Sequence, residues 1–393
     1  MHVNGIGMSD PGVIRSNNED YFHVDNDLHL YILCDGVGGS NCGEVASQLA
    51  AQTCAQLIQN NQKIIDEYYR TNDEKLITSL MEHAISESCL QVYTAGRKEI
   101  ALSGMATTLT ALLFFNQKAV LGHVGDSRCY LIRNNLSHQV TDDHTLGATL
   151  REQQKASNSQ IIDQKLDHIL NRCIGHHQHV EVDTLIFDIL PGDQLVLCSD
   201  GLHNYIRDPV QLIPMLKEDS PTACVKKMLE FAIHSGGQDN VTAILIENSL
   251  EESAYMKFDS DKADLLNDFS FLAGIYLFQD LNFIRMSRLL NDCQTKEYRK
   301  GQSICRKGEN PQGLFVFFSG HIQIEENPEK ILTRGDYFGQ QSLMYDSLLT
   351  FNVRAVEDST ILFISSKVYK KLCKNHPKFG VRLLENFIQG QKT

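Results

Sequence analysis

Residues 31–36 read YILCDG, a short apolar run that ends at Asp35 and Gly36. Four apolar residues followed by a turn signal predict a short buried strand. An aspartate at the end of such a strand carries its charge into a poorly solvated place, which is unfavourable unless something pairs with the carboxylate. Asp35 is therefore the first residue in the chain that indicates a site.

The same arrangement recurs elsewhere. The further acidic residues stand at strand ends or tight turns, beside glycine or asparagine: Glu19 and Asp20 after RSNN, Asp126 in GHVGDSR, Asp200 after LVLCS, and Asp239 in GGQDNVT. For any single one, a turn or helix-cap aspartate is the ordinary explanation. Hard divalent cations, however, prefer carboxylate and carbonyl oxygens. Repetition at several strand ends therefore favours a metal site.

The surrounding sequence predicts an α+β fold. Residues 44–58 and 74–93 are apolar at helical spacing, which indicates two long helices. Strand-like apolar runs lie at residues 31–34, 107–115, 118–124, 127–133, 182–189, 193–200 and 242–247. Turn signals separate them at Asn116–Gln117, Asn134–Asn135 and Pro191–Gly192. Many strands with two long helices suggest sheets packed under helices.

Composition limits the class of protein. The 393 residues are 42% hydrophobic and 22% charged, which is ordinary for a soluble globular chain. No apolar run approaches the roughly 20 residues that span a bilayer, and the first residues lack the pattern of a secretory signal. The 11 cysteines are scattered without CxxC pairs, so we expect neither a zinc site nor a disulfide framework. A cytoplasmic location is the simplest expectation.

The charge distribution suggests two domains. The formal net charge of −13 argues against nucleic acid as a partner. From Leu277 to the end, however, 17 basic residues outnumber 12 acidic ones. We therefore expect a first domain at residues 1–248, a polar linker or connecting helix at 249–276, and a second domain at 277–393. The acidity of the first domain is explained by metal ligands, by a solvated acidic surface, or by both.

Seven motifs identify the first domain. In chain order they are RSNNED (15–20), CDGVGG (34–39), GMATTL (104–109), GHVGDSRCYLIR (122–133), TDDHTL (141–146), PGDQLVLCSDGL (191–202) and GGQDNVTAILI (236–246). With them, residues 1–248 closely resemble the PPM (type 2C) protein phosphatases, particularly the compact bacterial form. The resemblance implies a β-sandwich of two antiparallel sheets flanked by helices, with metals at one end. It also implies hydrolysis of phosphoserine and phosphothreonine.

The resemblance assigns a role to each acidic residue in the motifs. Asp35 would bridge two metal ions, and the carbonyl of Gly36 would complete one coordination sphere. Asp200 and Asp239 would bind the first metal, and Glu19, or Asp20 through water, the second. Asp126 would hold a weaker third ion. The implied cofactors are thus two or three Mn²⁺ or Mg²⁺ ions.

The remaining site residues follow from the same motifs. Arg15 would bind the substrate phosphate, since its planar guanidinium matches phosphate oxygens. Asn240 would steady Asp239, and Thr107 and Thr108 would pack behind the ligands. The cations would activate a water for attack on phosphorus, so no cysteine is needed as a nucleophile. Val37 stands where eukaryotic members have histidine, and the general-acid role stays unassigned.

Two further segments of the first domain are candidates for a function. His176, His177 and His179 form a cluster that could hold a metal, but we expect a surface loop. Residues 145–172 occupy the position of the family's flap. They are polar, and we expect them to contact protein substrates.

The second domain resembles a different family. Its motifs are LFQDLNFIRMSRLL (277–290), YRKGQSICRKGENPQGLFVFFSGHIQI (298–324) and GDYFGQQSLMYDSLLTFNVRAVED (335–358). With these it resembles the cyclic-nucleotide-binding domain, which implies a β jelly roll with flanking helices. Its ligand cassette is degenerate and comprises Gly339, Gln340, Leu349 and Thr350.

Two changes in that cassette bear on ligand binding. Gln340 stands where the family has a glutamate for the ribose hydroxyl, and Leu349 where it has an arginine for the cyclic phosphate. Gln340 can still hydrogen-bond a hydroxyl, but Leu349 cannot neutralise a phosphate. We therefore expect no tight cAMP or cGMP binding, and a domain that regulates, binds a protein or senses another ligand.

The sequence is compatible with three functions. The leading one is a phosphatase acting on phosphoproteins made by a serine/threonine kinase, without nucleic acid or membrane as a partner. The alternatives are a phosphoprotein-binding scaffold and a cyclic-nucleotide-regulated sensor. Asp35, Asp200 and Asp239 are all present, which favours the enzyme. The sequence carries no signal for an oligomeric state.

Overall fold

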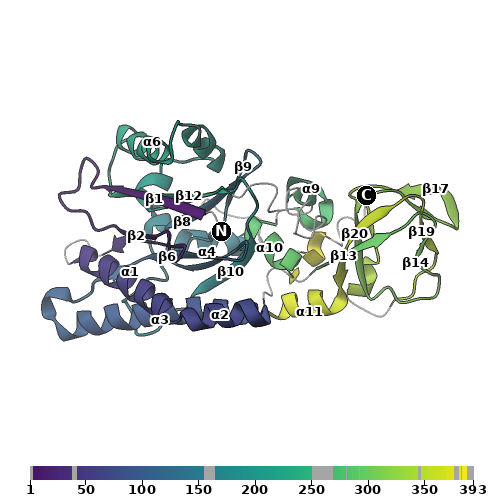
Figure 1. Ribbon diagram of the computed structural model, residues 1–393, viewed down its shortest axis with the longest axis horizontal. Coiled ribbons are helices and arrows are strands. Elements are labelled where there is room, and N and C mark those ends of the chain that lie inside the picture. The colour runs from purple at the N-terminus through teal and green to yellow at the C-terminus, as the bar shows by residue number, and fades with distance from the viewer. Residues whose placement is uncertain are drawn as a thin grey trace. The chain divides into compact units, whose positions relative to one another are not determined.

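A computed structural model describes residues 3–37, 42–154, 164–249, 269–279, 281–291, 293–343, 347–375, 380–381 and 383–386. The chain forms two compact units, Met1–Tyr255 and Met256–Thr393 (Figure 1). Among the described residues, no helix has the length and apolar character that crossing a membrane requires.

Two five-stranded antiparallel sheets form the centre of the first unit. The first sheet has the order β1 (Val3–Asp10), β12 (Val241–Asn248), β11 (Gln194–Cys198), β8 (Arg128–Arg133) and β9 (Leu136–Gln139). The second has the order β10 (Asp183–Asp188), β7 (Lys118–Val124), β6 (Leu109–Phe115), β3 (Leu30–Cys34) and β2 (Tyr21–Asp25). A two-stranded ladder joins β4 (Gly36–Val37) to β5 (Ala106–Thr107).

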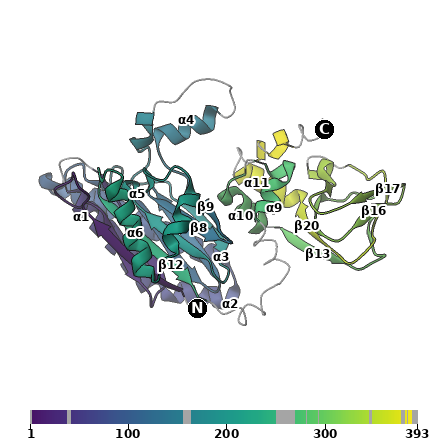
Figure 2. The same cartoon turned by 90° about the horizontal axis from the view of Figure 1, so that it is seen from above.

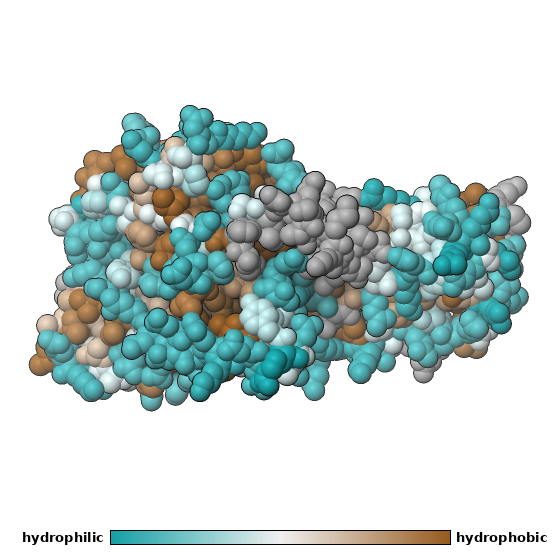
Figure 3. Space-filling model, viewed as in Figure 1, coloured by the Kyte–Doolittle hydropathy of each residue, from teal (hydrophilic) through white to brown (hydrophobic). Residues whose placement is uncertain are grey.

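Helices cover the outer faces of both sheets. Helices α1 (Gly43–Asn60) and α3 (Glu74–Lys98) pack on the second sheet, and α2 (Gln62–Thr71) packs on α3. On the first sheet lie α6 (Pro221–His234) and the 3₁₀ helix η3 (Pro209–Leu216). Figure 1 shows α6 on one side of the sheets and α1 to α3 on the other, and Figure 2 views the unit from the α6 side. The outward surface of α2 and α3 is mostly hydrophilic (Figure 3).

The sandwich expected from the sequence is confirmed, with differences in detail. The run 118–124 is a strand over its whole length, and the two long helices are present, although α3 continues to Lys98. Helices α2 and α6 were not predicted. The asparagine turns have positive φ at both central residues, 42° and 62° in one and 51° and 58° in the other, which suits a tight hairpin.

Strand register brings the acidic residues to one end of the sandwich. Tyr21 pairs with Cys34, so Asp20 and Asp35 flank the same end of β2 and β3. Cys198 pairs with Ala243 in β12 and with Arg128 in β8. The chain continues beyond these pairs at one end of the first sheet. Asp126, Asp200 and Asp239 all lie in these continuing segments.

The second unit contains two four-stranded antiparallel sheets, as the predicted jelly roll requires. One has the order β13 (Gln294–Tyr298), β20 (Ser359–Ser365), β15 (Gly313–Ser319) and β18 (Tyr337–Phe338). The other has β14 (Ser303–Cys305), β19 (Val353–Ala355), β16 (Ile322–Ile324) and β17 (Asn327–Leu332). The accompanying helices are α9 (Phe269–Gly274), η4 (Tyr276–Phe278), α10 (Phe283–Asn291), η5 (Gln340–Leu343) and α11 (Ser366–Asn375). Most of the expected linker, residues 250–268, lies outside the described residues.

Candidate metal centre

Asp35 is the centre of a group of mutually repelling carboxylates. Burial raises its pKa well above the usual range, and the carboxylates of Asp20, Asp200, Asp126 and Asp239 raise it further, in that order. Burial also raises the pKa of Asp200, as does Asp239, while a hydrogen-bonding contact with Asp35 lowers it. The five side chains therefore act on one another electrostatically at the end of the sandwich.

Two members of this group are almost fully buried. Burial is the main cause that raises the pKa of Asp20 to about 7 and that of Asp126 to about 7. Neither carboxylate oxygen of Asp20 has a hydrogen-bond partner, although the hydroxyls of Thr242 and Ser199 lie near enough to lower its pKa. Buried polar atoms are normally paired, so these two oxygens are suited to a ligand that the protein does not itself supply.

Hydroxyl groups fix the backbone of Asp35. Its N–H donates to Oγ1 of Thr108 at 2.9 Å, and its carbonyl accepts from Oγ1 of Thr107 at 2.9 Å. The hydroxyl of Thr108 in turn contacts that of Ser127 at 2.8 Å. Ser127 was not singled out from the sequence, although it follows Asp126 directly. This chain couples the end of β3 to the turn between β7 and β8.

Gly36 lies where no side chain fits. Its N–H donates to the carbonyl of Glu19 at 3.1 Å. A Cβ atom at this position would lie 2.5 Å from that carbonyl oxygen and 2.5 Å from the backbone of Gly43. The sequence Asp-Gly is therefore required by close packing of three backbone segments. Gly38 and Gly39 of the same motif lie outside the described residues.

Asn240 organises the loop that carries Glu19. Its side chain accepts from the Glu19 N–H at 2.9 Å and donates to the carbonyls of Pro11 at 3.0 Å and Asn17 at 2.8 Å. Its contact with Asp239 is made by the backbone, whose N–H donates to Oδ1 at 2.8 Å. The side chain of Asn240 therefore holds the loop, and only its backbone contacts Asp239. Burial raises the pKa of Glu19, and Glu44 adds to the effect.

Arg15 lies beside the acidic group. Its guanidinium donates to Oδ2 of Asp239 at 2.8 Å, and this contact is the main cause that raises the pKa of Arg15. The two side chains are 46% and 35% exposed, so the pair faces solvent. An arginine in this position can receive an anion from solvent at the edge of the carboxylate group.

Two histidines hold the turn that carries Asp126. His203 Nε2 contacts the Asp126 carbonyl at 2.9 Å, and because burial lowers the pKa of His203 to about 3, the ring is neutral and donates. The N–H of Gly125 donates to Nδ1 of His144 at 3.1 Å. Neither histidine was predicted to matter, although His144 lies in the TDDHTL motif.

The base of the expected flap is also described. Leu146 N–H donates to the Ile169 carbonyl at 2.9 Å, and Asn171 N–H to the His144 carbonyl at 2.9 Å. Helix α4 (Leu146–Gln154) and the 3₁₀ helix η2 (Gln164–His168) lie between these contacts, and residues 155–163 lie outside the described part. His176, His177 and His179 are exposed, as expected for a surface loop.

The donor set fits a hard divalent cation by its chemistry. Within the described part of the chain, no three or more His, Cys, Asp or Glu side chains lie close enough together to hold a metal ion as they stand. The grouped carboxylates nevertheless repel one another, and the two Asp20 oxygens are unpaired. Oxygen donors with concentrated negative charge are what Mg²⁺ and Mn²⁺ prefer.

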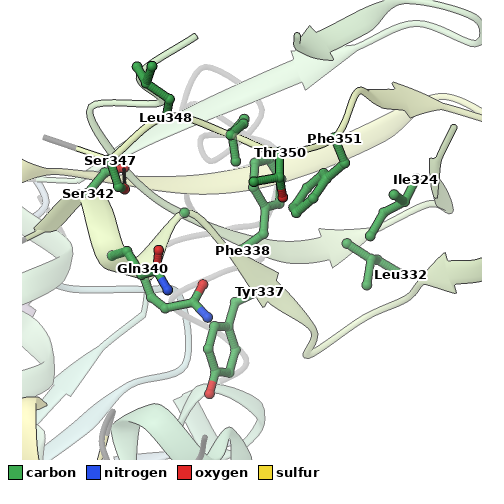
Figure 4. Close-up of a pocket in the computed structure, with 13 residues that line it drawn as sticks. Ile324, Leu332, Tyr337, Phe338, Gln340, Ser342, Ser347, Leu348, Thr350 and Phe351 are labelled. Atoms are coloured by element: carbon green, nitrogen blue, oxygen red, sulfur yellow. Dashed lines mark hydrogen bonds between the residues drawn. The ribbon is translucent and has the colours of Figure 1, made fainter. Parts of the chain in front are cut away.

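The four residues of the degenerate cassette also come together. Gly339, Gln340, Leu349 and Thr350 line one cavity in the second unit (Figure 4). Leu349 is 9% exposed and belongs to the apolar core of the barrel.

Comparisons with known proteins agree with both folds. Residues 15–230 match the family described as protein phosphatase 2C, and residues 295–376 match the cyclic nucleotide-binding domain. The serine/threonine phosphatase stp of Listeria welshimeri is 31% identical over 245 residues, which is 62% of this chain and 94% of that protein. The serine/threonine protein phosphatase PstP of Mycobacterium tuberculosis is 31% identical over 61% of this chain and 44% of its own length.

A solved structure supports the same assignment. The catalytic domain of PstP in complex with two manganese ions is 30% identical, with a TM-score of 0.53, over 62% of this chain and 97% of that one. The family match covers more than half of the chain, and the Listeria relative is matched over nearly its whole length. This chain belongs to the protein phosphatase 2C family, and a cyclic nucleotide-binding domain follows its phosphatase domain.

Proposed function

We propose that the chain is a metal-dependent phosphatase that hydrolyses phosphoserine and phosphothreonine in proteins, with Mn²⁺ or Mg²⁺ as cofactor. The observation that carries the proposal is the group of carboxylates around Asp35, which repel one another, together with the two unpaired oxygens of the buried Asp20. The relatives' names as serine/threonine phosphatases and the two manganese ions in the PstP structure support it.

Each carboxylate has a role in this proposal. Asp35 and the Gly36 carbonyl would hold cations together with Asp200 and Asp239 for one ion and Glu19, or Asp20 through water, for another. Asp126 would hold a third ion. When bound, the cations supply a water acidic enough to ionise near neutral pH, together with positive charge for the phosphoryl group.

The chain's own residues orient the reaction. Arg15 binds the phosphate of the substrate and leaves Asp239 free to bind a cation. Asn240 keeps Arg15 and Glu19 in place, because it holds both ends of the loop between β1 and β2. Thr108 fixes the position of Asp35, since it accepts from the backbone of that residue.

The proposal extends to the whole chain. We assign the phosphatase domain to residues 1–248, a connecting segment to 249–276 and a regulatory domain to 277–393 that does not bind cAMP or cGMP tightly. The substrates are phosphoproteins made by a serine/threonine kinase. We place the chain in the cytoplasm, because its 11 cysteines are scattered along the sequence without CxxC pairs.

Hydrolysis of p-nitrophenyl phosphate tests this function. We expect the full chain to be inactive in EDTA and active after Mn²⁺ is added. Asp35→Asn should lower activity at least about 100-fold, since second-shell changes alone cost 10–100-fold. Asp27→Asn is the matched control, because Asp27 is an exposed carboxylate outside the group. An Asp35→Asn enzyme as active as wild type would refute the proposal. Phosphopeptide binding without release of phosphate would favour the scaffold alternative.

A further inference from the structure

A cavity of about 270 Å³ lies in the second unit, between η5 and the strands β16 to β18. Its lining contains apolar and polar side chains, with Leu348 near the two serines and Thr350 beside Phe351 (Figure 4). Ile324, Leu332 and Phe351 face it from one side, and Gln340, Ser342 and Ser347 from the other. Small-molecule sites combine an apolar wall with a few polar groups in this way, and the volume suits a compact ligand.

The cavity offers no positive charge. None of the described side chains that line it is charged. At the position where a cation would be needed, Leu349 packs into the barrel core with Phe338 and Val353. Its backbone is fixed on both sides, because its N–H donates to Glu309 and its carbonyl accepts from Gly308, each at 2.9 Å. The leucine is thus part of the framework of the barrel.

Charges of both signs lie near the lining, because the backbone N–H of Lys307 donates to Oδ1 of Asn352 at 2.9 Å. Glu326 accepts from the backbone N–H of Asn352 at 2.7 Å and from its side chain at 3.0 Å. Asn352 directly follows Phe351, which lines the cavity. Neither Glu326 nor Lys307 belongs to the lining. A phosphate in the cavity would therefore lose water without gaining a counter-ion from a described lining side chain, which is unfavourable.

The polar side of the cavity suits uncharged hydroxyl groups. The hydroxyls of Ser342 and Ser347 lie 3.1 Å apart, and Ser342 is buried. A hydroxyl can donate and accept, and the Gln340 amide offers both functions as well. These groups can therefore pair with ligand hydroxyls without a charge on either partner.

We propose that this cavity binds an uncharged, hydroxylated ring compound of nucleoside size, and that it selects a nucleoside over the corresponding cyclic nucleotide. The ring packs against the side formed by Ile324, Leu332 and Phe351. The hydroxyls bond to the side formed by Gln340, Ser342 and Ser347. The inference goes beyond the phosphatase activity and does not depend on it.

Isothermal titration on the full chain tests the selection. The probes are adenosine and guanosine, each compared with its 3′,5′-cyclic monophosphate, so that the members of a pair differ by a charged phosphate. We expect at least one nucleoside to bind, and at least about tenfold more tightly than its cyclic monophosphate, a difference of about 1.4 kcal/mol. Equal or tighter binding of the cyclic monophosphates would overturn the proposal, and so would the absence of binding by both nucleosides.

Variants locate the site. Gln340→Ala should weaken nucleoside binding about fivefold, the usual effect of one neutral hydrogen bond. Lys307→Ala, at an exposed residue outside the lining, should leave it unchanged. If both variants bind like wild type, the ligand does not use this cavity and the proposal fails.

Introducing a cation tests the electrostatic argument directly. Leu349→Arg should reverse the preference in favour of the cyclic nucleotide. Since Leu349 is buried, the same change at exposed Thr350 provides a second variant with less risk to folding. Circular dichroism checks that each variant is folded. Two folded arginine variants that still prefer the nucleoside as strongly as wild type would contradict the charge argument.

Discussion

Arg15 and Asp239 form an ion pair that faces solvent at the edge of the carboxylate group. Exposed ion pairs contribute at most about 1 kcal/mol to stability. A hydrogen bond to a charged phosphate, in contrast, contributes about 1.5–3 kcal/mol, or roughly 10- to 150-fold in a rate or binding constant. The two roles of Arg15 can therefore be separated by measuring stability and activity on the same variant.

We expect Arg15→Ala to lower kcat/KM for a phosphopeptide by about 10- to 150-fold while the melting temperature stays near that of wild type. Arg15→Lys should recover only part of the loss, because an ammonium group lacks the planar fork. Steady-state kinetics and thermal melting check both statements. A variant that melts much earlier, or that keeps full activity, would assign Arg15 a structural role instead.

At the scale of single residues, the acidic positions could be singled out because a carboxylate after an apolar strand is conspicuous in sequence. His144 and His203 could not, because each acts on the backbone of the Gly125–Asp126 turn, far away along the chain. Asn240 was identified, but the sequence did not reveal that its side chain holds the loop that carries Glu19.

Among the elements of the first unit, Arg133 and Asp193 tie strand ends together. Arg133 Nε donates to Asp193 Oδ1 at 2.8 Å, and Nη2 to Oδ2 at 2.6 Å. Nη2 also donates to the Asp188 carbonyl at 2.9 Å, and the Leu190 N–H donates to Asp193 at 2.7 Å. The pair therefore fixes the end of β8 against β10 and the turn before β11. Both side chains are almost fully buried.

We expect Asp193→Ala to destabilise the first unit by about 3–5 kcal/mol, because Arg133 keeps a buried charge without its partner. Burial raises the pKa of Asp193 although Arg133 lowers it, which indicates how strongly this site opposes charge. The double variant Arg133→Met, Asp193→Leu should be more stable than the single variant. Urea unfolding measures these differences.

The control for that experiment is an exposed pair. Lys226 and Glu230 lie 3.5 Å apart on α6, with side chains 67% and 53% exposed. Glu230→Ala should change the free energy of unfolding by less than about 1 kcal/mol. If Glu230→Ala lowers the free energy of unfolding as much as Asp193→Ala does, burial does not explain the contribution of the Arg133–Asp193 pair to stability.

Elements were predictable where one pattern dominates. The central strands of the first unit read as apolar runs between turn residues, and α1 and α3 have long apolar faces. Strands β1, β2 and β9 are less apolar and were not predicted. Helix α2 is short and Tyr68 is its one buried residue, and it was missed although its apolar residues recur at helical spacing. The ladder of β4 and β5 is only two residues long on each side, and its pairing depends on Gly36 meeting Thr107 across the fold.

At the scale of the whole chain, the two units have separate hydrophobic cores. Buried clusters lie on the outer faces of both sheets of the first unit, and another fills the barrel of the second. The units divide between Tyr255 and Met256, whereas the change in charge was placed near residue 277. A domain with its own core can unfold as a cooperative unit, so two transitions are expected.

Ligands that bind different units should then shift different transitions. A ligand at 100 times its Kd stabilises its unit by about 2.7 kcal/mol, which corresponds to roughly 5–10 °C for the first unit and to a larger shift for the smaller second unit. We expect Mn²⁺ to raise the melting temperature of the first unit alone, and adenosine that of the second. Asp35→Asn should remove the manganese shift and keep the nucleoside shift, and Gln340→Ala should reduce only the latter. Calorimetry on the full chain measures the melting temperatures of both units. A single transition that either ligand shifts would mean that the two units unfold together.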